Sequence, residues 1–150
     1  MSFRGEFNNS IDPKGRASIP AKFREILAEK YSGEHLVVTP KDGGLVAYPP
    51  SVWKMIEESV DAMQPGQRKE DIYLTLINPA ADCTFDKQGR IQLPSALREY
   101  AGLNPDIREI VVAGVSNKIM IWNKAQHSEM RRQAEARLKA DSQDLFALGF

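Results

Sequence analysis

The chain contains 150 residues, and its 20 lysines and arginines balance its 20 aspartates and glutamates, so the formal net charge at pH 7 is zero. This balance excludes a uniformly basic protein that would attract nucleic acid through its total charge. The single cysteine, Cys83, excludes a disulfide within the chain and suits a reducing compartment. No apolar run reaches the length of a membrane span, and Met1–Gly5 lacks the apolar run of a signal peptide, so we expect a soluble cytoplasmic protein without a membrane partner.

Charge is unevenly distributed along the sequence. Residues 1–24 carry five basic side chains against two acidic ones, a surplus of three, whereas residues 53–82 carry three basic against six acidic, a deficit of three. A chain polarised in this way presents one basic face despite its neutral total.

The first third of the chain predicts a small β-rich unit with one helix. In chain order we expect strand 7–11, strand 16–19, helix 21–27, strand 36–39 and strand 45–48. The helix begins after Pro20, because proline lacks the N–H that a first helical turn leaves unpaired. Phe23, Ile26 and Leu27 recur at helical spacing and form its apolar stripe.

The turn between the first two strands carries a motif that occurs twice. Asp12-Pro13-Lys14-Gly15-Arg16 returns as Asp86-Lys87-Gln88-Gly89-Arg90 after 74 residues, and the same shift aligns the helices and later strands without a gap. Asp12 and Asp86 at the first position and Gly15 and Gly89 at the fourth make each motif a tight β-turn at a hairpin tip. One fold unit therefore occurs twice. Since each copy is too small for an ample core of its own, we expect the copies to pack as a pseudo-dimer.

Helices are expected after each copy. We assign residues 7–50 and 80–123 to the two units, 51–79 to a helical linker and 124–150 to a C-terminal helix and tail. Ser51 is expected to cap the first linker helix. The apolar face of that helix consists of Val52, Met55, Ile56, Val60 and Met63. A second linker helix is expected over 68–77, and the C-terminal helix over 124–140.

The tail contains four large apolar residues, which suggest docking onto this chain or onto a neighbour. They are Leu145, Phe146, Leu148 and Phe150.

The residue pattern argues against an enzyme. His35, His127 and Cys83 are far apart in the sequence and form neither metal-ligand spacing nor a nucleophile with its base. No glycine-rich phosphate loop precedes a helix. We therefore expect no catalytic residues, no metal, no cofactor and no small-molecule ligand.

Arg16 and Arg90 directly follow the two turns, each four residues after an aspartate. Two compatible interpretations of these arginines stay open. Each arginine pairs with its own aspartate and ties the turn. Alternatively, the two loops also carry Lys14, Lys87 and the arginines outward, where an aspartate that holds a guanidinium also orients it towards a phosphate or a guanine edge.

The chain closely resembles the MraZ family, bacterial regulators built from two tandem SpoVT/AbrB-like domains. The resemblance is carried by the twin Asp-x-x-x-Arg motifs, the opening Phe3-Arg4-Gly5 and the segment Arg16–Pro20 with Phe23-Arg24. The resemblance covers nearly the whole chain. It implies an α+β, β-rich fold of two swapped-hairpin β-barrel units that form a pseudo-dimer, with subunits assembled into a ring-shaped homo-oligomer. It also implies nucleoid association and repression of the division and cell-wall gene cluster, through direct repeats of double-stranded DNA in the promoter ahead of the family's own gene.

The resemblance assigns the DNA contacts by motif. They fall on Arg16 and Arg90, with support from Lys14, Lys87, Arg24 and Arg98. Asn9 and Cys83 occupy positions that are often basic in the wider AbrB pattern, and Gln88 replaces Lys14 in the second loop. These departures favour the first copy as the stronger DNA contact.

Two functions of other classes remain as alternatives. One is an antitoxin-like protein-binding module whose C-terminal segment wraps a toxin. The other is a ring scaffold without specific DNA binding, which the zero net charge permits.

Overall fold

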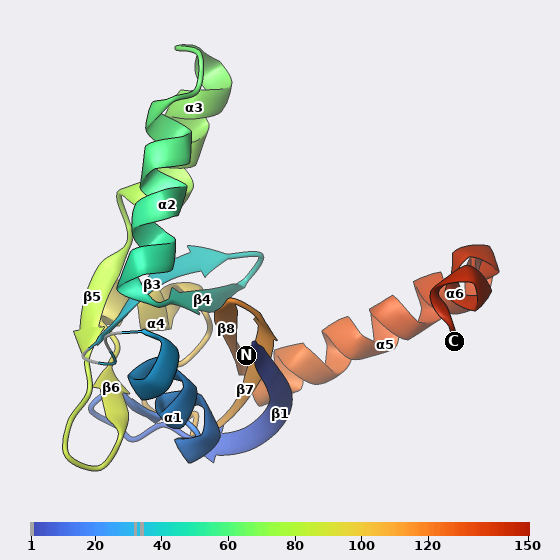
Figure 1. Ribbon diagram of the computed structural model, residues 1–150. Coiled ribbons are helices and arrows are strands. Elements are labelled where there is room, and N and C mark those ends of the chain that lie inside the picture. Colours follow the sequence, from blue (N-terminus) through green and yellow to red (C-terminus); the bar gives the residue numbers. More distant parts are fainter. Residues whose placement is uncertain (1, 32, 34) are drawn as a thin grey trace.

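The computed structural model describes residues 2–31, 33 and 35–150, and shows an α+β body from which two helical arms project (Figure 1). A six-stranded antiparallel sheet has the order β1-β7-β8-β4-β3-β5, and a separate two-stranded ribbon joins β2 to β6. The strands are β1 (Phe3–Ser10), β2 (Arg16–Ser18), β3 (His35–Lys41), β4 (Gly44–Tyr48), β5 (Ala81–Thr84), β6 (Arg90–Gln92), β7 (Glu109–Ser116) and β8 (Lys118–Asn123). The helices are α1 (Ala21–Lys30), α2 (Pro50–Asp61), α3 (Gln67–Ile72), the π-helix η1 (Tyr73–Ile77), α4 (Ser95–Tyr100), α5 (Lys124–Ala140) and α6 (Gln143–Leu148). The architecture confirms the predicted α+β class. Within the described ranges, no helix combines the length and the apolar character needed to cross a membrane.

The predicted helices over 21–27, 68–77 and 124–140 are confirmed, the second of them as α3 followed by η1. α1 follows Pro20 and buries Phe23, Ile26 and Leu27, as its apolar spacing predicts. α5 spans Lys124–Ala140, and the side chain of Asn123 caps it by accepting the N–H groups of Ala125 and Gln126.

The cap predicted at Ser51 is wrong. The helix α2 starts at Pro50, with Pro49 in the cap position two residues before Ser51, and Ser51 lies inside its first turn. Pro50 fits the first helical position because proline lacks an N–H and its φ angle already suits the helix.

The predicted hairpin between the first two strands is limited to its tip. Beyond the single bridge between Ile11 and Ala17, β1 pairs with β7 and β2 pairs with β6. Correspondingly, β5 pairs with β3 rather than with β6. Each copy of the repeat therefore completes its sheet with a strand of the other copy, which buries apolar surface that a short local hairpin would leave in water.

The register of the strands follows the repeat. Val46 lies opposite Met120 and Ala17 lies opposite Ile91, so at both places a residue pairs with its own equivalent 74 positions away. The helices follow the same relation, since Phe23 in α1 and its equivalent Leu97 in α4 are both buried in one core. The two copies thus share a single hydrophobic core.

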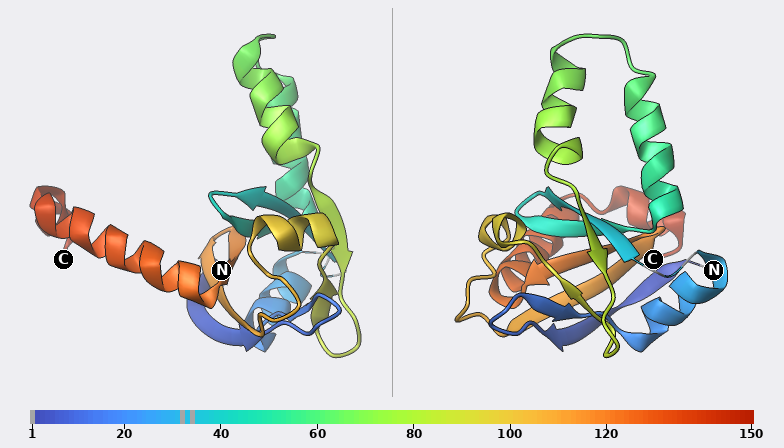
Figure 2. Two further views of the ribbon diagram at one scale, coloured as in Figure 1. Left: turned by 180° about the vertical axis from the view of Figure 1, so that it is seen from behind. Right: turned by 90° about the vertical axis from the view of Figure 1, so that its left-hand side faces the viewer.

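The first arm consists of α2, α3 and η1, which run antiparallel away from the sheet (Figure 2). Thr39 Oγ1 donates a 2.5 Å hydrogen bond to the carbonyl of Leu76 and ties η1 to β3. Trp53 and Val60 are buried, but Met55 is 67% exposed. The predicted apolar face of α2 is therefore only partly covered by the chain itself.

The second arm is α5 with α6, and it leaves the body in a different direction (Figure 1). Glu6 of β1 holds the base of this arm, because its carboxylate pairs with Arg131 and lies 3.3 Å from His127 Nε2. At the far end, Phe146 and Phe150 are each 87% exposed.

Candidate nucleic-acid interface

The first turn is organised by the side chain of Asp12. The backbone carbonyl of Asp12 accepts the N–H of Gly15 at 2.9 Å, which closes the β-turn. Its Oδ1 accepts the backbone N–H groups of Lys14 at 3.1 Å and Arg16 at 2.8 Å, and its Oδ2 accepts Arg16 Nε at 2.5 Å. The carboxylate thus fixes both the loop backbone and the guanidinium that follows it.

The second turn repeats this geometry. Asp86 Oδ1 accepts the N–H groups of Gln88 at 2.9 Å and Arg90 at 3.0 Å, and Oδ2 accepts Arg90 Nε at 2.9 Å. The backbone hydrogen bonds from Arg16 and Arg90 are the main reason that the pKa values of Asp12 and Asp86 lie below their usual range. Both carboxylates therefore stay ionised next to their arginines at neutral pH.

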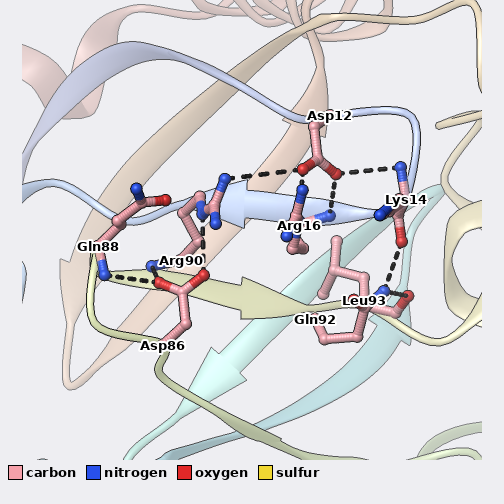
Figure 3. A network of polar contacts seen from close by, with 8 residues as sticks. All are labelled: Asp12, Lys14, Arg16, Asp86, Gln88, Arg90, Gln92 and Leu93. Atoms are coloured by element: carbon pink, nitrogen blue, oxygen red, sulfur yellow. Dashed lines mark hydrogen bonds and ion pairs between the residues drawn. The ribbon is translucent and has the colours of Figure 1, made fainter.

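The two arginines lie on one face of the β2–β6 ribbon (Figure 3). In the ribbon, Ala17 and Ile91 are fully buried, so by the two-residue period of a strand their neighbours point outward. This outward face consists of Arg16, Ser18, Arg90 and Gln92. We call it the ribbon face.

Several contacts join the two turns across the ribbon. Ile19 N–H donates to the carbonyl of Gly89 at 3.1 Å, and the equivalent Leu93 N–H donates to that of Gly15 at 2.9 Å. Arg90 Nη1 lies 3.7 Å from Asp12 Oδ2 and so links the two motifs directly. The separation between the two arginines is therefore set by backbone bonds and not by flexible loops.

Arg24 and Arg98 flank the ribbon by crossing to the opposite copy. Arg24 Nε donates to the carbonyl of Ile19 at 3.1 Å, yet its guanidinium covers Gly89, where an added Cβ would lie 2.5 Å from it. Arg98 covers Gly15 in the same way. The positive φ angles of Gly15 and Gly89 favour glycine at both positions, and an added Cβ would also displace the arginine head that covers each of them.

The structure places the six basic residues expected from the sequence on this end of the molecule. Lys14 and Lys87 are exposed on the two turns, Arg16 and Arg90 lie on the ribbon face, and Arg24 and Arg98 lie beside it.

Sequence reasoning missed two residues next to these. Gln92 belongs to the ribbon face, and its Nε2 donates to the carbonyl of Lys14 at 2.6 Å. The sequence could have indicated this, because Gln92 lies two residues after Arg90, and residues two apart in a strand lie on the same face. Arg108 lines a polar groove of about 490 Å³ beside Ser18, together with Asn9. No sequence signal indicated this groove, because it joins segments that lie far apart in the chain.

The protruding ribbon with its basic side chains suits a polyanionic partner that has a groove wide enough to admit the ribbon. A two-stranded β-ribbon fits the major groove of B-form DNA, and arginine is the side chain that most often reads guanine there. Among the described residues, no group of three or more His, Cys, Asp or Glu side chains is placed to hold a metal ion. The thiol of Cys83 is buried, and burial raises its pKa to about 12, so it is a poor nucleophile.

The fold and the ribbon define a class of protein, namely an internally repeated α+β chain whose two copies jointly build one arginine-bearing β-ribbon. Comparison with protein families matches residues 2–72 and 76–148 to the family described as "MraZ protein, putative antitoxin-like". A protein of Syntrophotalea carbinolica named "Transcriptional regulator MraZ" is 59% identical over 150 residues, the full length of both chains. Proteins of the same name from Desulfitobacterium hafniense and Pediococcus pentosaceus are 38% and 36% identical, over 98% of this chain and 99% of theirs. The chain belongs to the MraZ family. Its relatives are named as regulators of transcription, and none of these names is that of an enzyme.

Proposed function

We propose that this protein is a sequence-specific DNA-binding transcriptional regulator whose β2–β6 ribbon enters the major groove. The observation that carries the proposal is the pair of aspartate-held arginines on the ribbon face, Arg16 and Arg90. The names of the relatives support the same class of function.

The aspartates leave the arginines able to read DNA. In each pair the guanidinium donates its Nε–H to the carboxylate. A guanidinium carries four further N–H donors, and two of these suffice for a bidentate contact with O6 and N7 of guanine. An arginine that is already oriented loses less conformational freedom when it binds. We assign phosphate contacts on either side of the ribbon to the exposed Lys14 and Lys87 on the turns and to Arg24 and Arg98 beside it.

The target and the assembly follow from the family resemblance. We propose that residues 7–50 and 80–123 are two swapped-hairpin units that form a pseudo-dimer, and that the protein represses the division and cell-wall gene cluster from direct repeats in its own promoter. A subunit with two to four phosphate contacts binds weakly, since each contact contributes a salt slope of about 0.9. A ring-shaped oligomer on repeated sites, associated with the nucleoid, overcomes this through high local concentration.

The test is fluorescence anisotropy of labelled DNA from upstream of the gene, titrated at two salt concentrations. We expect Arg16→Ala to weaken binding to the repeats by about 10- to 100-fold, the discrimination of one bidentate contact. The control is Arg68→Ala, which removes the same charge from an exposed position at the start of α3, away from the ribbon. Equal binding by the wild type and both variants, or equal affinity for any DNA, would contradict the proposal.

The family description contains the word "antitoxin-like", which supports a second candidate function. In this function the exposed α6 segment binds a toxin protein. Retained DNA binding by a protein lacking residues 141–150, together with loss of binding to the product of a neighbouring gene, would favour the second candidate as an additional activity.

A further inference from the structure

A polar groove adjoins the ribbon face on its β1 side. The end of β1, the end of β2 and the start of β7 enclose a volume of about 490 Å³ there. The lining residues are Asn8, Asn9, Ser10, Ser18, Arg108 and Glu109. We call this the β1 groove. Ser18 lies opposite Arg90 in the ribbon, so the groove begins beside one of the two arginines that we assign to the reading of bases.

The backbone of Arg108 is held against the first turn. Its carbonyl accepts the N–H of Ile11 at 2.9 Å, and Ile11 directly precedes that turn. The segment before β7 therefore lies at the same end of the body as the two turns (Figure 2). The exposed side chain of Arg108 donates through Nη1 to the carbonyl of Pro105, and no carboxylate of the described residues lies at ion-pair distance from it. Glu109 instead pairs with Lys124 at 3.4 Å, which partly balances the negative charge in the groove.

The other side chains of the β1 groove supply neutral hydrogen-bond donors. Asn9 Nδ2 donates to the carbonyl of Ser18 at 2.9 Å and so joins the end of β1 to the end of β2. Within residues 2–31, 33 and 35–150, the side chains of Asn8, Ser10 and Ser18 make no hydrogen bond to the protein. Hydroxyl and amide groups, together with arginine, are the side-chain donors that contact phosphate oxygens of DNA. The groove therefore combines one cation with donors that the fold itself does not use.

The corresponding place in the second copy has the opposite charge. By the shift of 74 residues, Asn8 corresponds to Asp82 and Arg108 corresponds to Glu34 in the sequence. The side chain of Asp82 is 74% exposed, and its Oδ1 lies 3.8 Å from Nε2 of His35. An exposed carboxylate at this position repels a phosphate group. The two sides of the ribbon thus differ in charge, although the ribbon itself repeats the same motif.

We propose that the β1 groove binds a phosphate of the DNA backbone through Arg108, and that this chain makes the contact on one side of its ribbon only. The inference rests on the proposed function, because it requires the ribbon to lie in the major groove. In that position, elements beside the ribbon face the phosphates that border the groove. The contacted phosphate lies on the side of the base that Arg90 reads, because Arg90 and not Arg16 is the neighbour of Ser18 across the ribbon.

The first test is an anisotropy titration of DNA that carries a single repeat, at two salt concentrations, with Arg108→Ala. We expect binding to weaken about 10-fold, the lower end of what a hydrogen bond to a charged group contributes. The salt slope should fall by about 0.9, the value of one phosphate contact. Because Arg108 is exposed and lies outside the core, thermal unfolding of the variant should match that of the wild type.

Two further variants serve as controls for the role of charge. Arg68→Ala removes an exposed positive charge at the start of α3 and should bind like the wild type. Arg108→Lys keeps the positive charge in the groove and should retain the salt slope of the wild type.

Neutral methylphosphonate groups, introduced one at a time into the single repeat, locate the contacted phosphate. We expect the wild type to lose about 10-fold in affinity at one phosphate, on the flank of the base read by Arg90. Arg108→Ala should lose nothing further at that phosphate, and the two proteins should respond equally at every other one. If Arg108 only supported the fold, its loss would weaken binding to every substituted DNA by the same factor.

Three results would overturn the inference. They are wild-type affinity and salt slope in Arg108→Ala, equal methylphosphonate effects on the two proteins at every phosphate, and Arg108-dependent effects on both flanks of the repeat. Failure of the proposed function gives a different result. If the groove inference alone is wrong, Arg16→Ala still weakens binding to the repeat. If the regulator proposal is wrong, the wild type binds the repeat no better than unrelated DNA.

Discussion

Replacing Gly89 by Ala tests whether the crossing of Arg24 onto the opposite copy holds the ribbon in its binding geometry. An added Cβ at Gly89 would lie 2.5 Å from Arg24 Nε, the atom that donates to the carbonyl of Ile19. The guanidinium must therefore shift, and we expect this hydrogen bond to break. Gly102 provides a matched control, because its φ of +68° is close to the +76° of Gly89, whereas its added Cβ would meet Asn123 at an ordinary 3.6 Å.

The expected magnitudes follow from these differences. In both variants the left-handed backbone costs about 1–2 kcal/mol, which is offset by about 0.4–1 kcal/mol from the stiffer unfolded chain. Gly89→Ala also loses one hydrogen bond, worth about 1 kcal/mol. For a protein of this size we expect the melting temperature to fall by about 2 °C in Gly102→Ala and about 5 °C in Gly89→Ala.

The assay combines thermal unfolding by circular dichroism with the anisotropy titration. If Arg24 contacts phosphate as proposed, Gly89→Ala should also weaken DNA binding and lower the salt slope by about 0.9, because the guanidinium of Arg24 is displaced. Gly102→Ala should bind like the wild type. Identical melting temperatures and affinities for the two variants would show that the contact between Arg24 and Gly89 does not constrain the ribbon.

Three further predictions concern stability and reactivity. Because the pKa values of Asp12 and Asp86 are lowered in the fold, their stabilisation is present above the unfolded value of about 3.9 and is lost as the pH falls through the lower folded values. A variant with both aspartates changed to Asn should therefore melt below the wild type at pH 7, with a difference that shrinks as the pH falls below about 4, and a constant difference would contradict this. Cys83, which is buried with a pKa of about 12, should react with Ellman's reagent at pH 8 only after denaturation, so rapid labelling of the native protein would be inconsistent with the structure. Phe23→Ala should destabilise the fold by about 3–5 kcal/mol in urea unfolding, because its fully buried ring packs edge-on against two other rings, and a loss below about 1 kcal/mol would refute this packing.

Local signals in the sequence predicted several elements well. Apolar spacing and Pro20 were enough to define α1, because both act within a few residues of each other. The predicted bounds of the helix over 124–140 match those of α5. Ser51 misled the prediction of a cap, since two prolines before it already start the helix.

Strand partners were less predictable than the strands themselves. The turn at Asp12 indicated a hairpin, and the turn does form, but β1 joins β7 from the other copy. The choice between these partners depends on how much apolar surface each arrangement buries, which is a property of the assembled chain. The contact of Arg24 with Gly89 could not be predicted from the sequence either, because it depends on how one copy packs against the other.

The exchange of strands between the copies has a consequence for how the chain folds. β1 ends at Ser10, and its partner β7 spans Glu109–Ser116, so the chain must be synthesised to Ser116 before the whole first strand can pair. Contacts between such distant segments slow folding, because a long loop must close before any of them forms. A chain carrying only one copy of the repeat would meet the same requirement between two molecules, and would fold only as it dimerises. Fusing two copies in one chain replaces that concentration-dependent encounter with an intramolecular one.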